Sequence, residues 1–366
     1  MLAIFDMSSA NIERYNSDLL KNYSGQYVAY VDDPEFCTEL DSPEAILICS
    51  SGWSIKKIMH SIEKHHVSVV IISGQRPADF RIVIAANKLN IPIIYKMHGL
   101  YVTRVKRNAL FYFSNISKVF KTVRYLFDIA FSTGNIRIAI GIFLSFVFGW
   151  PRRNWMVSED LRVDHGLVWS EYWKSWHERC WSMNPRQGWK TTGNPDTTKF
   201  ATIPTKDKSF CYVYQTLVED GRISRSTMES FYDKLARIAR TQNKIVHVKW
   251  HARGDATMRE GLERRGFHIH NKFPIGTIYV GHFSSLLGLV PLIGGLVIVF
   301  ELEGHATPDP IRQCATLITS DIDTLEEGVA STYDVDESKK TNAIYYFGDH
   351  YFHNVEELIV SQHTDD

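Results

Sequence analysis

The chain has 366 residues, which is enough for two domains of ordinary size, each with its own hydrophobic core. Its 41 Lys and Arg residues are balanced by 41 Asp and Glu residues, so the chain as a whole carries no charge that would attract nucleic acid. Its 5 cysteines form no CxxC pair, which is typical of reduced thiols in a cytoplasmic protein and argues against a zinc site.

Residues 1–100 alternate apolar strands with segments of helical periodicity. The first strand is expected at residues 1–7, which lack the basic start of a secretion signal, and further strands are expected at 27–31, 45–49, 67–72 and 91–95. Strands that are separated by helices form parallel βαβ units. We therefore predict a doubly wound α/β sheet in this half of the chain.

Residues 101–153 interrupt that alternation. This segment has nine basic residues and one acidic residue, Asp128, among many aromatic and aliphatic side chains, so its net charge is 9 − 1 = +8. A basic, aromatic-rich amphipathic segment can lie in the interface of an anionic membrane. The alternative is a pair of helices that pack on the sheet and turn a solvated basic face outward. We expect docking on the inner face of the cytoplasmic membrane, without a spanning helix, because the apolar run at 138–150 is too short to cross a bilayer.

The βαβ alternation resumes after residue 165. A strand is expected at 166–170 and a helix at 171–181, and polar turn residues then predict a domain boundary near residue 203. A second series follows, with strands at 210–215, 244–251, 277–281 and 296–300 and helices at 224–241, 256–266 and 284–290. We predict two Rossmann-like domains, 1–202 and 203–366, facing a central cleft.

Three strands of the second domain are each followed by residues that can bind an anion or move a proton. These are Gln215, Glu219, Asp220 and Gly221 after the first strand, Lys249, His251 and Arg253 at the second, and Gly281, His282, Ser284 and Ser285 after the third. Ligands bind at the carboxyl ends of strands in open α/β sheets. Carboxylates there can act as general base or nucleophile, and cations and helix-start hydroxyls suit phosphate. A solvated turn, a core histidine and a helix cap are the respective alternatives.

The strand at 91–95 of the first domain is followed by His98 and Gly99. We expect both on the acceptor side of the cleft, with His98 as a candidate base and a structural turn histidine as the alternative. His268 and His270 are alternate residues of a strand with no third ligand nearby, so we expect a structural role for them. The absence of Walker, GxGxxG, HExxH and GxSxG motifs disfavours phosphate-loop NTPases, typical dinucleotide enzymes and serine hydrolases.

The three blocks of the second domain, in this order, resemble bacterial GT-B glycosyltransferases that use CMP-activated ulosonic acids, namely the Kdo transferases and sialyltransferases. The resemblance covers residues 210–305 and rests on an acidic-acidic-Gly motif at 219–221, a Lys-x-His-Pro motif at 249–252 and a serine motif at 284–285. Ala252 stands where those families have proline, which puts in doubt the turn that aims His251. The resemblance implies that His251 contacts the CMP phosphate or protonates the departing CMP, that both serines bind this phosphate, and that Asp220 or Glu219 is the catalytic carboxylate.

We therefore predict a metal-independent glycosyltransferase, without a cofactor, that moves Kdo or sialic acid from its CMP donor to a lipid-linked glycan in capsule or lipopolysaccharide biosynthesis. Glu303 completes the expected donor contacts. One alternative is a GT-B transferase with a UDP-sugar or CDP-polyol donor. A second is a non-catalytic module that binds lipid or polysaccharide.

Overall fold

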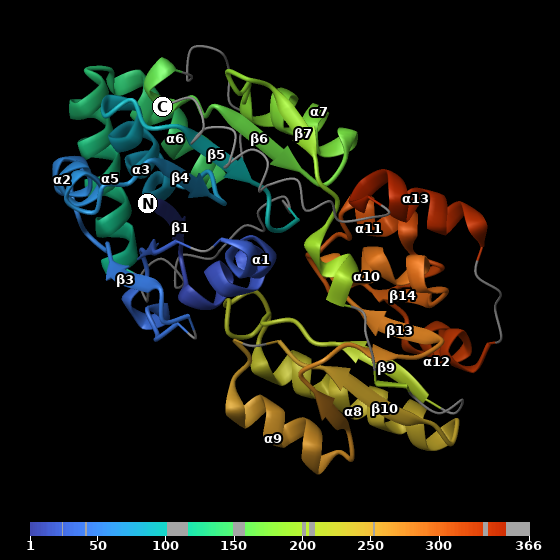
Figure 1. Cartoon of the computed structure of the whole chain (residues 1–366). Helices are drawn as coiled ribbons and strands as arrows, with labels where there is room; N and C mark the ends of the chain where they lie inside the picture. Colours follow the sequence, from blue (N-terminus) through green and yellow to red (C-terminus); the bar gives the residue numbers. More distant parts are fainter. Residues whose placement is uncertain are drawn as a thin grey trace. The chain divides into compact units, whose positions relative to one another are not determined.

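The computed structural model describes residues 1–348 apart from Ser24, Asp41, 101–115, 149–157, 200–202, 205–208, Ala252 and 332–335. These residues form two compact units, of which the first takes most of the chain up to Thr192 and the second takes Gly99 and the chain from Gly193 onward (Figure 1). That boundary lies ten residues before the predicted one (203 − 193 = 10).

The first unit is built on a seven-stranded parallel sheet with the order β3-β2-β1-β4-β5-β6-β7. Its strands are β1 (Leu2–Asp6), β2 (Tyr27–Val31), β3 (Ala45–Cys49), β4 (Val69–Ile72), β5 (Ile93–Lys96), β6 (His165–Val168) and β7 (Trp189–Thr191). β1, β2, β4 and β5 are buried along their whole length, which explains their continuous apolar sequences. The three residues of β7 are too few to show a period, and this strand was not predicted.

Helices cover this sheet. They are α1 (Ser9–Asn22), α2 (Ile55–Lys64), α3 (Pro77–Lys88), α5 (Ile116–Thr133), α6 (Ile136–Phe148) and α7 (Glu171–Trp181), with short 3-10 turns η1 (Pro34–Phe36) and η3 (Glu159–Leu161). α5 and α6 pack against each other and over α3, and α5 also contacts α2 (Figure 1). This covering explains why α3 is buried over most of its length.

The second unit has a six-stranded parallel sheet with the order β11-β10-β9-β13-β14-β15. Its strands are β9 (Ser209–Val213), β10 (Ile245–Lys249), β11 (His268–His270), β13 (Ile278–Gly281), β14 (Leu296–Phe300) and β15 (Leu317–Thr319), and a separate pair joins β8 (Ile203–Pro204) to β12 (Pro274–Ile275). The helices are α8 (Arg225–Thr241), α9 (Ala256–Arg264), α10 (Ser285–Leu289), α11 (Asp309–Cys314), α12 (Ile322–Ala330) and α13 (Glu337–Phe347), with 3-10 turns η4 (Pro195–Lys199) and η5 (Val290–Ile293). Two Rossmann-like parallel sheets with helices confirm the predicted fold class.

Candidate functional site

The candidate site lies at the C-terminal edge of the second sheet. β9 is central, since it pairs with β10 on one side and with β13 on the other, and β14 follows β13. All of these pairs are parallel, so the loops after β9, β10, β13 and β14 leave the sheet at the same edge. These are the loops that hold the residues predicted to bind the donor.

Asp220 lies in a tight turn after β9. Gly221 adopts a left-handed conformation (φ +64°), which favours glycine at this position. The Asp220 carboxylate accepts a hydrogen bond from the Thr216 hydroxyl at 3.2 Å and lies 3.7 Å from the Arg253 guanidinium. Arg253 also donates to the Thr216 hydroxyl at 3.4 Å. The loops after β9 and β10 are thereby joined by a half-exposed ion pair.

Glu219 has a different environment from its neighbour Asp220. Its Oε1 accepts hydrogen bonds from the Tyr214 hydroxyl at 2.7 Å and from the Asp255 backbone N–H at 2.8 Å. Burial, the nearby Tyr232 and the hydrogen bond to Glu219 raise the pKa of Tyr214, so its hydroxyl remains a donor. Because Asp255 is the N-cap of α9, the Glu219 carboxylate positions the start of that helix.

Lys249 is the last residue of β10, and His251 follows it two positions later. His251 Nδ1 accepts a hydrogen bond from the Arg253 backbone N–H at 3.1 Å, so the neutral imidazole carries its proton on Nε2. Lys249 Nζ donates to the backbone carbonyls of Trp250 at 2.8 Å and Asn271 at 2.7 Å, which holds the ammonium against the backbone of the edge. Arg253 is therefore in contact both with the His251 ring, through its backbone N–H, and with the Asp220 carboxylate, through its guanidinium.

His282, in contrast, points into the core. Its Nδ1 donates to the Phe300 carbonyl at 2.7 Å, and its Nε2 accepts from the Tyr212 hydroxyl at 3.1 Å. Burial lowers its pKa to about 4, so the ring is neutral at pH 7. With both nitrogens bonded in the core, His282 links β9, β13 and β14, and neither nitrogen is left for the donor contact that the sequence predicted.

The loop after β13 is fixed by polar contacts of its own. Ser284 is the N-cap of α10, and its hydroxyl accepts the Leu286 backbone N–H at 3.3 Å. Gln215 Oε1 accepts the Phe283 backbone N–H at 2.9 Å, so this predicted donor ligand positions the β13 loop. Ser285 begins α10 and is partly exposed at the same edge. A side chain at Gly281 would press on Leu287, which accounts for glycine at the end of β13.

Three residues that the sequence analysis did not single out complete this edge. The ring of His305, from the loop after β14, stacks on Phe283 with centroids 6.1 Å apart and an angle of 17°. The guanidinium of Arg222 lies 5.6 Å from the centre of the Phe283 ring. His305 Nε2 donates to the Arg222 carbonyl at 3.2 Å, whereas its Nδ1 is buried and has no hydrogen-bond partner among the described residues. The predicted donor contact Glu303 is exposed in the turn just before His305.

His98 lies at the corresponding edge of the first sheet, after β5, and Gly99, which follows it in the chain, is counted with the second unit. His98 Nδ1 donates to the carbonyl of Ser73, which follows β4, at 2.8 Å. Burial alone would raise the pKa of Asp6 at the end of β1, but His98 and Arg76 and two hydrogen bonds outweigh it and hold this pKa below its usual value. The edge thus joins a buried carboxylate to a histidine. A side chain at Gly99 would meet no atom within 4 Å.

Within the part of the chain that the structure describes, no three or more His, Cys, Asp or Glu side chains are arranged to hold a metal ion. His268 and His270 lie on β11, and His270 Nε2 shares a 2.9 Å hydrogen bond with His247 Nδ1 on β10. Burial, His270 and His268 lower the pKa of His247 to about 4.

No family model and no curated protein matches the sequence. Solved structures do match its whole length: S. aureus MnaA in complex with UDP (14% identity, TM-score 0.54, 98% of this chain and 94% of that one), the spinosyn forosaminyltransferase SpnP (10%, 0.53, 99% and 99%), and the wall teichoic acid polymerase TagF with CDPG (11%, 0.51, 100% and 88%). At this identity the likeness shows the fold alone, and that fold is GT-B, with two Rossmann-like domains.

Proposed function

We propose that this protein is a GT-B transferase that binds a nucleotide-linked sugar or polyol at the C-terminal edge of its second sheet. The observation that carries the proposal is the cluster of Asp220, Thr216, His251 and Arg253 at the ends of the neighbouring strands β9 and β10. It combines a carboxylate, an imidazole N–H and a guanidinium at the place where open α/β sheets bind ligands.

A UDP-sugar or CDP-polyol is the favoured donor. Among the similar structures, MnaA is in complex with UDP and TagF was soaked with CDPG. Both ligands are named as nucleoside diphosphates. They therefore support a UDP-sugar or CDP-polyol donor more than the CMP-linked ulosonic acid that the motifs favoured. The guanidinium groups of Arg253 and Arg222 at this edge are suited to the charge of a diphosphate.

In the proposed reaction an acceptor hydroxyl attacks the anomeric carbon of a UDP-sugar and UDP departs, or it attacks the polyol-bearing phosphorus of a CDP-polyol, so that the polyol phosphate is transferred and CMP departs. Asp220 is the better candidate for the base that takes the acceptor proton, because the Glu219 carboxylate already accepts bonds from Tyr214 and Asp255. His251 Nε2–H and Arg253 would stabilise the negative charge on the departing nucleotide. Because these side chains would compensate the negative charge of the departing nucleotide, we expect activity without a divalent metal.

The acceptor is proposed to be a glycan, on a lipid carrier at the inner membrane face, bound at the C-terminal edge of the first sheet. His98 and Asp6 lie at that edge, where a histidine next to a buried carboxylate could position an acceptor hydroxyl.

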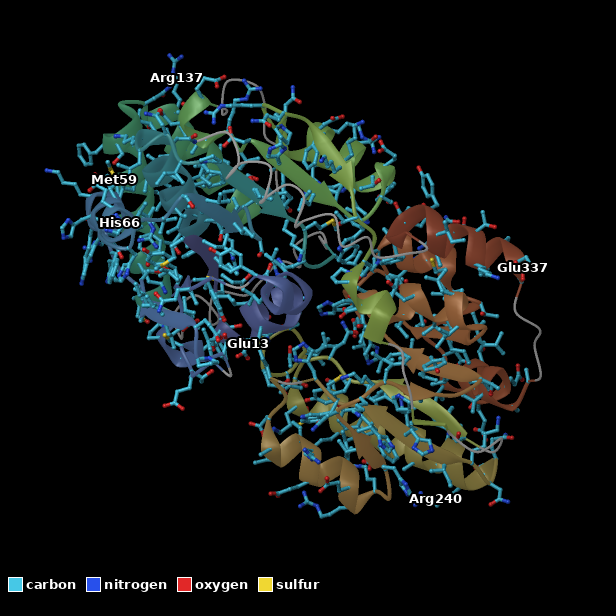
Figure 2. All side chains as sticks on the ribbon, in the orientation of Figure 1. Glu13, Met59, His66, Arg137, Arg240 and Glu337 are labelled. Atoms are coloured by element: carbon cyan, nitrogen blue, oxygen red, sulfur yellow. The ribbon has the colours of Figure 1, made fainter. Side chains whose placement is uncertain are left out.

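Thermal unfolding with UDP, CDP, UMP and CMP, each with and without magnesium, tests the proposal. A nucleotide at about 100 times its dissociation constant stabilises the native state by about 2.7 kcal/mol. We expect UDP or CDP to give the largest shift without magnesium, and Arg253→Gln to remove it. Arg240→Gln is the matched control, because Arg240 lies at the C-terminal end of α8, beside the opposite edge of the sheet (Figure 2). No shift with any nucleotide would contradict the proposal and favour a non-catalytic binding module.

The second candidate is the transferase that uses a CMP-linked ulosonic acid. It is favoured by the placing of the acidic-acidic-Gly, Lys-x-His and serine motifs after three neighbouring strands of one sheet. Stabilisation by CMP alone, lost in His251→Ala, would support this donor, and turnover of CMP-Kdo or CMP-sialic acid would then identify it.

A further inference from the structure

Helix α5 is apolar on two opposite faces. Tyr125, Leu126 and Ile129 are buried where the helix packs on the first unit. The other face is an apolar stripe at helical spacing, in which the exposed fractions are 52% for Ile116, 68% for Phe120, 57% for Phe127 and 83% for Phe131, with Val119 and Val123 between them. A surface helix of a globular domain ordinarily presents polar residues on this face.

Helix α6 repeats the same arrangement. Ile138 and Ile142 are buried, whereas an exposed stripe runs along the other side through Ile136, Ile140 and Phe143 to Phe148. The connection to α5 is short and turns at Gly134 (φ +65°), so the two helices form an antiparallel hairpin. Single exposed apolar side chains are common, but two adjacent stripes of this size mark a binding surface.

The hairpin is fixed firmly to the first unit. Asp32, which follows β2, accepts hydrogen bonds from Arg81 at 2.7 Å and from the Tyr125 hydroxyl at 2.8 Å, and Lys121 Nζ lies 3.3 Å from the same carboxylate. Asp128 accepts the Ile55 backbone N–H at 2.7 Å and so joins α5 to the start of α2. Since these contacts orient α5, its apolar stripe is presented outward by the folded protein.

The charge of the α5–α6 hairpin favours an anionic lipid surface as its partner. The two helices contain four basic residues and one acidic residue (4 − 1 = +3), and Asp128 faces α2. Arg124 and Arg137 are exposed, and the Arg137 side chain projects from α6 (Figure 2). In a symmetric dimer the same patch would meet itself and bring these cations together. An anionic lipid surface accepts both the apolar stripes and the cations.

We propose that the α5–α6 hairpin lies in the interfacial layer of an anionic bilayer, with Phe120, Phe127 and Phe131 inserted among the acyl chains and Arg124 and Arg137 at the phosphates. Along the described residues, no helix is long and apolar enough to cross a membrane. Because the exposed apolar stripes run along the length of both helices, the proposal places the two helices in the plane of the surface. The network around Asp32 holds the part of α5 around Lys121 and Tyr125 at the C-terminal edge of the first sheet, where the acceptor side is proposed, although the binding itself does not depend on the enzymatic proposal.

Sedimentation of the full chain with vesicles tests this proposal. Vesicles of phosphatidylcholine mixed with phosphatidylglycerol should bind the protein, and vesicles of phosphatidylcholine alone should bind it more weakly. Replacing Phe120, Phe127 and Phe131 by Ser should lower the partition coefficient at least about tenfold, because interfacial binding scales with buried apolar area. The control replaces Ile245 and Ile344, two apolar side chains of the second unit that are 40% and 39% exposed, by Ser and should leave binding unchanged.

Charge is tested with Arg124→Gln combined with Arg137→Gln, which should weaken binding to anionic vesicles and leave binding to neutral ones unchanged. Lys121 is unsuitable, because its removal would also disturb Asp32. Equal binding by the Phe-to-Ser variant and the unaltered chain would overturn the proposal. The proposal would also be overturned, in favour of a second copy of the chain as partner, if the unaltered chain does not bind vesicles and forms a dimer in the ultracentrifuge while the Phe-to-Ser variant is a monomer.

Discussion

Tyr125→Phe removes one hydroxyl from the buried network that holds α5 to the first sheet. This hydroxyl donates to Asp32 Oδ1 at 2.8 Å and accepts the Gly52 backbone N–H at 2.7 Å. The ring lies 3.3 Å from the Arg81 guanidinium carbon and is kept in the variant. Burial, partly opposed by Arg81, raises the pKa of Tyr125 to about 12, so the hydroxyl is a donor at neutral pH.

The expected loss follows from these two bonds. A hydrogen bond to a charged group contributes about 1.5–3 kcal/mol, and a buried N–H without a partner costs about 1–3 kcal/mol. Gly52 is only partly buried, so water can replace some of its lost bond. We expect the free energy of unfolding of the first unit to fall by about 2–4 kcal/mol.

Urea unfolding followed by circular dichroism measures this loss. The control is Tyr345→Phe, whose side chain is mostly exposed on α13 and which should change stability by less than about 0.5 kcal/mol. Hydrogen exchange of the peptide that contains Gly52 should become faster in Tyr125→Phe. A change below about 0.5 kcal/mol with unaltered exchange would refute the account of the network.

Two further predictions concern stability. Burial lowers the pKa of His177 and His282 to about 4, so below pH 6.5 the unfolded chain binds protons at these histidines that the native chain does not. The free energy of unfolding should therefore fall by about 3 kcal/mol per histidine as the pH falls from 6.5 to 4. Equal urea midpoints at pH 7.5 and 4.5 would contradict this. Gly288→Ala should cost about 1–3 kcal/mol because its methyl group would overlap the Phe347 ring, whereas Gly99→Ala, which meets open space, should be near neutral in the same urea titration.

The strands and the loops that follow them could be predicted from the sequence, because apolar runs and turn residues are local signals. Asp220, His251 and Arg253 were expected at one edge for this reason, since parallel strands end together. The different environments of Glu219 and Asp220 could not be predicted, because they depend on Tyr214 and Asp255, which are brought together only by the fold.

His282 shows a signal that was present in the sequence and was not used. Ile278, Val280 and His282 alternate along β13 and its continuation, and the first two belong to the core. Extending this alternation by one step predicts that His282 points inward, as observed. His305, in contrast, reaches Phe283 from a loop after another strand, and no local pattern predicts that contact.

The surroundings of the basic segment, residues 101–153, could be predicted only in part. Its charge indicated a membrane surface, with packing on the first domain as the alternative, and the described helices show packing along one face of the hairpin. The sequence could not tell which cations are used internally, and Lys121 pairs with Asp32. Nor could composition separate the buried aromatic face of α5 from the exposed one.

Hydrogen exchange of the protein with saturating UDP, and separately with CDP, tests the central claim most directly, since it locates the nucleotide site without assuming a reaction. The account predicts slower exchange in the loops after β9, β10 and β13, within residues 214–222, 250–255 and 281–286, and no change at the opposite edge, around residues 240–246 and 265–268. Protection confined to that opposite edge or to the first unit, or no protection with either nucleotide, would contradict it.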